Sequence, residues 1–129
     1  MLGEEYLLSG LLAAALAWAG NRFLFSLCKF DGLLWGPLLE EALKTGLALA
    51  WGAPLLLVHA VFGLVEAVWE LTRARGGAAL AAVAGHSLFG AAAAALWEGT
   101  GRAALAWGGG FLLHFLWNAA LWRLHRRGG

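Results

Sequence analysis

Charged side chains are scarce in this sequence. Of 129 residues, 13% are charged and 61% are hydrophobic, whereas a soluble domain carries about 25% charged residues. The 9 basic residues nearly balance the 8 acidic ones, so we expect no basic surface that binds nucleic acid and no acidic tail. A single cysteine, Cys28, excludes an intrachain disulfide, a CxxC redox pair and a thiolate zinc site. The composition indicates a protein of the lipid bilayer.

Long apolar runs divide the chain into five predicted membrane helices. Each crossing takes about 20 residues, and the runs lack the alternation of barrel strands, so the prediction is an all-α, polytopic membrane helix bundle. Glu4 and Glu5 stand where a signal peptide would carry positive charge, so we interpret the first run as a helix of the bundle. No repeat or linker divides the chain, and residues 1–129 are expected to form one domain. The predicted helices cover approximately residues 6–20, 33–52, 54–72, 78–97 and 102–124.

Basic residues in the short loops predict the orientation. Lys and Arg gather in cytoplasmic loops, and here only Arg102 falls on the opposite side. The prediction is a multi-pass protein of the cell (inner) membrane, with the N terminus outside and the C terminus in the cytoplasm. The residues that mark the cytoplasmic side are Arg22, Lys29, Arg73, Arg75, Arg123, Arg126 and Arg127.

Ionisable side chains lie inside the predicted spans. A charge at the bilayer centre costs about 2.5 to 3.5 kcal/mol on insertion scales, so each of these residues calls for a reason. At about 1.5 Å per helical residue, four of the helices bring such a residue to one layer, roughly 9 to 13 Å from the cytoplasmic helix ends. The four are Glu40, Glu66, His86 and His114.

Further polar residues share faces with this layer. Lys44 is four residues from Glu40 and three from Glu41, so one ammonium is expected to reach both carboxylates. Asn118 follows His114 by four residues and shares its face. His59 lies more than a turn nearer the outer surface, and we interpret it equally as a member of the site or as a bystander.

Two adjacent carboxylates in a medium of low dielectric constant provide an acid and a base in one place. Glu40 and Glu41 therefore favour attack by a glutamate-activated water on a carbonyl group. His114, His86 or Asn118 would donate hydrogen bonds to the developing oxyanion.

A metal site is a second reading of the same layer. Glu66, His86 and His114 would make a two-histidine, one-carboxylate catalytic site for a divalent metal such as Zn²⁺. The sequence has no HExxH motif, so this expectation rests on the composition of the layer alone. No other cofactor is expected.

Three classes of function remain open on the residues alone. The polar layer could be the active site of a hydrolase. It could instead hold the helices of a non-catalytic membrane interaction or immunity protein together by hydrogen bonds, or act as a relay in a proton or cation translocator. The outer half of the predicted bundle is nearly all apolar, which argues against a pore.

Four ordered motifs resemble those of a known family. The set E40-E41-x-x-K44, F62-x-x-x-E66, G85-H86-S-L-F-G90 and H114-x-x-x-N118 resembles PrsW-type intramembrane proteases, relatives of the CPBP group that includes the CAAX prenyl endopeptidases. This chain would be a minimal-length member, since the motifs span residues 40–118.

The resemblance implies a bacterial intramembrane endopeptidase of the glutamic or metal-dependent type. Its implied partner is a transmembrane or membrane-anchored protein substrate. The oligomeric state is left open between a monomer and a homo-oligomer. Glu40 and Glu41 would match the essential pair, one activating water and the other orienting it. The remaining implied catalytic residues are Lys44, Glu66, His86, His114 and Asn118.

Overall fold

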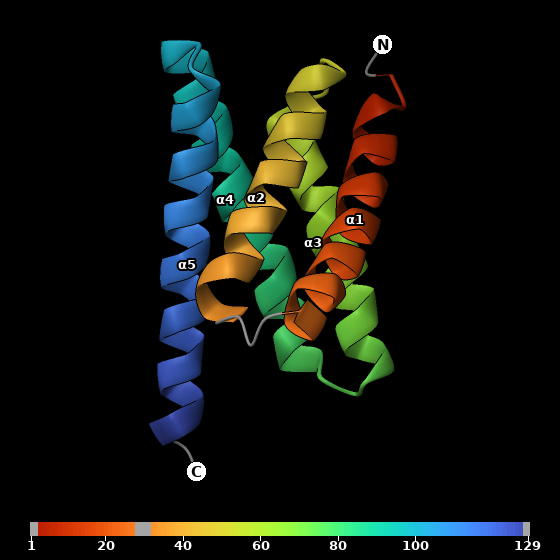
Figure 1. Ribbon diagram of the computed structural model, residues 1–129, viewed down its shortest axis with the longest axis vertical. Helices are drawn as coiled ribbons and strands as arrows, with labels where there is room; N and C mark the ends of the chain where they lie inside the picture. The colour runs from red at the N-terminus through yellow and green to blue at the C-terminus, as the bar shows by residue number, and fades with distance from the viewer. Residues whose placement is uncertain (1–2, 28–31, 128–129) are drawn as a thin grey trace.

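The computed structural model describes residues 3–27 and 32–127; Cys28 and Lys29 lie outside this part. Five α-helices make up the described bundle (Figure 1), which confirms the predicted all-α class. They are α1 (Glu5–Leu27), α2 (Gly32–Ala50), α3 (Leu55–Thr72), α4 (Gly76–Thr100) and α5 (Ala103–Arg127).

The first helix is longer than the sequence predicted. It continues through Asn21 and Arg22 to Leu27, although these two polar residues were expected to close it near residue 20. Polar side chains do not themselves stop a helix when they find partners on one face, and the amide of Asn21 bonds to Glu40 of α2. The break before α3 is where the sequence places it, at Gly52, with a φ of 64°, and Pro54.

Four of the described helices are long and apolar enough to cross a membrane: α1, α3, α4 and α5. The remaining helix, α2, carries Glu40, Glu41 and Lys44 within its 19 residues and is not among these four helices. It is nevertheless part of the bundle, packed against α1, α3 and α5. Large apolar side chains cover the outside of all five helices, as in a membrane protein. Helix α1 begins at one end of the bundle and α5 ends at the other (Figure 1).

The interior is apolar at one end and polar in the middle. We call the end with the α2–α3 and α4–α5 turns the upper end, and the end with the α3–α4 turn the lower end (Figure 1). Near the upper end, a cluster of small and branched residues closes the bundle. It consists of Ala48, Ala53, Leu55, Val58, Ala93 and Ala106.

Glycines let α4 approach α3 closely next to the polar layer. A Cβ at Gly63 would lie 2.9 Å from the Cβ of His86, and one at Gly90 would lie 2.9 Å from Cγ of His59. Both contacts are shorter than packed carbon atoms tolerate. The absence of a side chain at these two positions therefore sets how near the histidines come to the helix opposite.

Candidate functional site

Glu41 of α2 is the centre of a buried polar cluster. Its side chain is completely buried, yet three groups contact its two oxygens. Nζ of Lys44 lies 2.5 Å and Nδ1 of His114 lies 2.8 Å from Oε1, while Nε2 of His59 lies 2.9 Å from Oε2. A buried carboxylate is costly unless it is paired and hydrogen-bonded, and these contacts from α2, α3 and α5 meet that need.

His59 belongs to this cluster. Its Nδ1 lies 2.8 Å from the carbonyl oxygen of Leu55, and a carbonyl only accepts, so Nδ1 carries a proton. Its Nε2 then faces Oε2 of Glu41, and a hydrogen bond there needs a second proton, held by the ring or by the carboxyl group. The sequence left His59 open between site and bystander, and the structure places it in direct contact with Glu41.

Lys44 joins Glu41 to His86. Nζ of Lys44 lies 2.9 Å from Nδ1 of His86, and an ammonium can only donate. The imidazole therefore carries its proton on Nε2, which donates to Oε2 of Glu66 at 2.6 Å. The sequence predicted that Lys44 reaches both carboxylates of α2. Within the described residues its hydrogen bonds go instead to Glu41 and His86, and the ammonium also lies 4.5 Å from the ring centroid of Phe62.

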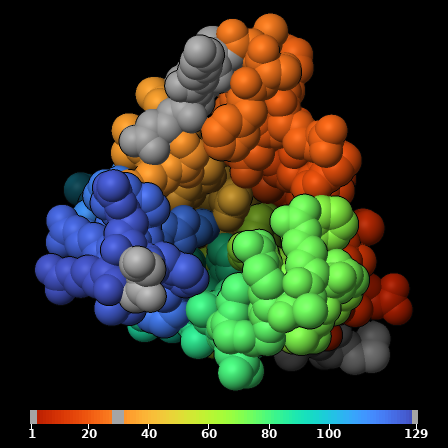
Figure 2. Space-filling model, turned by 90° about the horizontal axis from the view of Figure 1, so that it is seen from below, coloured from red at the N-terminus to blue at the C-terminus, as the bar shows by residue number. Residues whose placement is uncertain are grey.

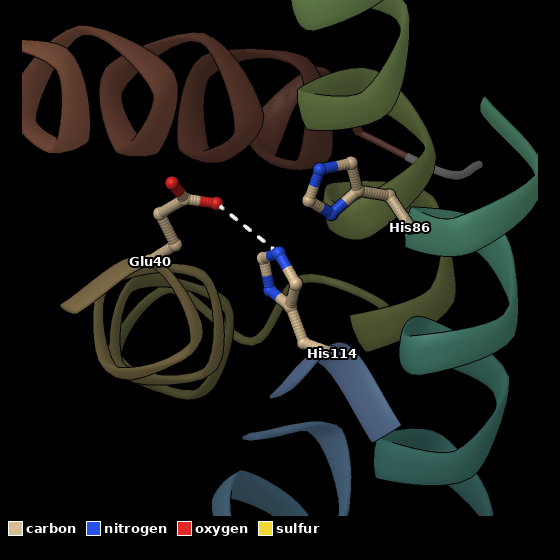
Figure 3. Close-up of side chains that lie close together, drawn as sticks. All are labelled: Glu40, His86 and His114. Atoms are coloured by element: carbon tan, nitrogen blue, oxygen red, sulfur yellow. Dashed lines mark ion pairs between the residues drawn. The ribbon is translucent and has the colours of Figure 1, made fainter. Parts of the chain in front are cut away.

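Glu40 is held much more loosely than Glu41. Its side chain is 19% exposed, and the one hydrogen bond it makes among the described residues comes from Nδ2 of Asn21, at 3.3 Å. Its Oε2 lies 3.8 Å from Nε2 of His114, facing it across a gap too long for a direct hydrogen bond (Figure 3). His114 uses Nδ1 to bond Glu41, so Nε2 is the atom it presents to Glu40.

Asn21 is a hydrogen-bond partner of Glu40 that the sequence did not predict. It was interpreted as the polar end of the first span, whereas it lies inside α1 on the face that meets α2. Its distance from Glu40 along the sequence gives no periodic signal. The polar residue within an otherwise apolar run was the available hint.

Two cavities reach the polar cluster. One, of about 560 Å³, opens at the lower end between the α3–α4 turn and α5, where the space-filling view is hollowed (Figure 2). Its wall includes Glu66, His86, His114 and Asn118. Asn118 makes no hydrogen bond to the cluster within the described residues, so its amide is free to bind a molecule in this cavity.

The second cavity, of about 840 Å³, is an apolar groove between α1 and α3. Glu40 and Glu66 are the two carboxylates in its wall. Glu66 lines both cavities. A molecule in the groove and a water molecule in the lower cavity would therefore both reach the polar cluster at Glu66.

By distance, three side chains form a group that could hold a metal ion. They are Glu40, His86 and His114, each with a ligand atom within 4.8 Å of the others (Figure 3). The set differs from the predicted one by one carboxylate, with Glu40 in place of Glu66. Glu66 is instead the hydrogen-bond acceptor of His86.

Hydrogen bonding fits this group to a metal only in part. His114 suits a ligand, because its Nδ1 bonds the carboxylate of Glu41 and leaves Nε2 exposed to the gap. His86 does not, because Lys44 and Glu66 occupy its two ring nitrogens. Binding a metal through His86 would break one of these bonds and place the ion near the ammonium. The arrangement as it stands is a hydrogen-bonded network, and we derive no chemical step through a metal.

Comparisons of this chain with protein-family models, with curated proteins and with solved structures give no match. Its function therefore has to be derived from the cluster and the two cavities that reach it.

Proposed function

We propose that this protein is an intramembrane endopeptidase, in which Glu40 activates a water molecule for attack on a peptide bond. The observation that carries the proposal is the contrast between the adjacent carboxylates. Glu41 is completely buried and contacted by three groups, whereas Glu40 is partly exposed, weakly bonded and faces a gap beside His114. A general base must be within reach of the water it deprotonates, and only Glu40 of the pair meets this condition.

The reaction would proceed in two steps. Glu40 takes a proton from water, and the hydroxide oxygen forms a bond to the carbonyl carbon, whose oxygen becomes an oxyanion. The Glu41 carboxylate holds Nδ1 of His114, so Nε2 of the neutral ring would accept a hydrogen bond from the attacking water, and the side-chain amide of Asn118 would donate to the oxyanion. Glu40 then passes its proton to the amide nitrogen as the C–N bond breaks, giving a carboxylic acid and an amine.

The other residues of the cluster keep these two groups in place. Lys44 and His59 fix Glu41, and Glu41 orients His114. Glu66 orients His86 from the wall of the lower cavity. Asn118, one helical turn from His114, lies in that wall, where its amide would serve as the oxyanion donor. The motif resemblance to PrsW-type proteases supports the same reaction class.

The proposed setting is the inner membrane, with the lower end of the bundle on the cytoplasmic side. Arg73 and Arg75 at the α3–α4 turn and the basic end of α5 lie at this end, as expected for a cytoplasmic face. Water would reach the cluster through the lower cavity. A transmembrane or membrane-anchored polypeptide is the proposed substrate.

A proton or cation translocator has less support. A translocator needs a polar path to both faces, and an apolar cluster that contains Val58 and Ala93 packs above His59. The chain of hydrogen bonds that begins at Glu66 passes through His86, Lys44 and Glu41 and reaches His59. The buried hydroxyls of Ser9 and Thr45 make no hydrogen bond within the described residues, so they do not extend the hydrogen-bonded chain. This chain therefore ends inside the described bundle.

The direct test is a comparison of membrane-protein N termini in cells that express the wild type or Glu40→Gln at equal abundance. We expect new termini in or beside transmembrane segments with the wild type alone. Glu98→Gln is the matched control, because Glu98 is exposed near the end of α4 and should leave the wild-type pattern intact. Identical patterns for wild type and Glu40→Gln, with both proteins folded, would refute the proposal.

A further inference from the structure

We propose that the groove between α1 and α3 binds an apolar transmembrane segment of the substrate polypeptide and pairs an acidic side chain of that segment with Arg22. This inference rests on the proposed function and names how the substrate reaches the site. It concerns the larger of the two cavities, which faces outward between two helices that are apolar enough to span the membrane.

The groove is shaped by small residues on one helix and larger ones on the other. Ala14, Ala15 and Ala17 of α1 line it together with Phe62 and Val65 of α3. Its rim carries exposed apolar side chains, since Trp18 is 54% and Val68 is 61% exposed. A segment that diffuses in the bilayer could enter sideways without leaving an apolar surrounding.

The inner wall selects a polypeptide over a lipid chain. Glu40 and Glu66 stand in this wall, and Oε1 of Glu66 makes no hydrogen bond within the described residues. Carboxylate oxygens in an apolar groove need donors. The N–H groups of an unwound peptide supply donors, whereas an acyl chain has none, and a lipid phosphate would be repelled by the two carboxylates.

The charge of Arg22 indicates which flank of the substrate segment lies near the lower end of the bundle. Arg22 is the one cation among the residues described as lining the groove. Its guanidinium lies 5.0 Å from the ring centroid of Trp18, which holds it at the groove rather than free in solvent. An Asp or Glu side chain on the cytoplasmic flank of the substrate segment complements this charge.

The test is photocrosslinking in liposomes with a defined probe. The probe is a synthetic Leu/Ala peptide of about 20 residues, long enough to span the bilayer, with Asp on one flank; a matched peptide carries Lys there. A photoreactive phenylalanine replaces Ala15 in the groove or, as a control, Leu112 of α5, which is 54% exposed and lies outside the groove. Both proteins carry Glu40→Gln, so that the peptide is not consumed.

We expect the Asp peptide to be captured from position 15 roughly fivefold more than the Lys peptide, the effect of one ion pair near a protein surface. Position 112 should show no preference. Arg22→Glu should reverse the preference, and Arg22→Gln should abolish it. Equal capture at both positions, lipid adducts alone at position 15, or a preference that Arg22→Glu leaves unchanged would each overturn the inference.

This readout requires no hydrolysis, so it fails independently of the proposed activity. Selective capture at position 15 without any new cellular termini would refute the protease and keep a segment-binding groove. New termini with no selective capture would refute the groove and keep the protease.

Discussion

Lys44 of α2 and His86 of α4 are joined by a buried hydrogen bond of 2.9 Å from Nζ to Nδ1. The same ammonium lies 2.5 Å from Oε1 of Glu41. One cation therefore neutralises the buried carboxylate and fixes the tautomer of the histidine, and it links α2 to the wall of the lower cavity.

Replacing Lys44 by Met should destabilise the bundle by about 3 to 5 kcal/mol, because it leaves the Glu41 charge buried without its cation. Thermal unfolding in detergent measures the loss. Adding Glu41→Gln to Lys44→Met should recover part of it, because the double variant buries no unpaired charge. If the double variant loses as much unfolding free energy as the two single variants together, Lys44 and Glu41 are not coupled through their ion pair.

His59→Leu should cost about 2 kcal/mol of stability, because it removes the group that bonds Oε2 of Glu41 in a completely buried place. His125→Leu is the matched control. His125 bonds the carbonyl of Leu121 at the exposed end of α5, so its replacement should change the unfolding free energy by less than about 0.5 kcal/mol. Equal effects of the two changes would contradict the placement of His59 in the cluster.

Glu40→Gln and Glu41→Gln should separate activity from stability. Within the described part of the chain Glu40 makes one long hydrogen bond, so Glu40→Gln should leave stability within about 1 kcal/mol of the wild type. It should lower cleavage about 100-fold or more, because it removes the proposed base. Glu41→Gln should lower both, because it removes the charge that Lys44 and His114 contact. Cleavage rates and unfolding temperatures of the purified variants test the contrast, which fails if Glu40→Gln remains active.

Two glycines of α5 offer a matched pair. A Cβ at Gly110 would lie 2.7 Å from Oε2 of Glu41, whereas one at Gly108 would have no neighbour within 4 Å. Gly110→Ala should therefore destabilise the bundle by about 1 to 3 kcal/mol through overpacking and displace the Glu41 carboxylate. Gly108→Ala should stabilise it by up to about 1 kcal/mol through helix propensity. Unfolding temperatures that move in the same direction would argue against this packing of α5 on α2.

Removal of divalent metals should leave peptide cleavage unchanged, because Lys44 and Glu66 already occupy both nitrogens of His86. The measurement is cleavage of a substrate found by N-terminal comparison, before and after treatment with a chelator and again after addition of Zn²⁺. Loss of activity with the chelator and its return with Zn²⁺ would establish a metal held by Glu40, His86 and His114.

The amino-acid sequence by itself determined the class of fold and the membership of most of the cluster. Scarce charge and long apolar runs predict membrane helices, and helical spacing places Glu40 and Lys44 of α2 on a shared face. The cost of burying charge explains why the polar residues of α2, α3, α4 and α5 meet, since each satisfies the others. These inferences depend on periodicity and composition, which are local properties of the chain.

Only the tertiary structure decided which polar atoms are paired. Asn21 contacts Glu40, His59 contacts Glu41, and Lys44 bonds His86 rather than both carboxylates. Adjacent residues on one helix point about 100° apart, so Glu40 and Glu41 meet different neighbours, and those neighbours come from helices far away in the sequence. The contrast between a fully paired Glu41 and an available Glu40 arises from that packing, because close approach at glycines such as Gly63 and Gly110 sets which donors reach each carboxylate.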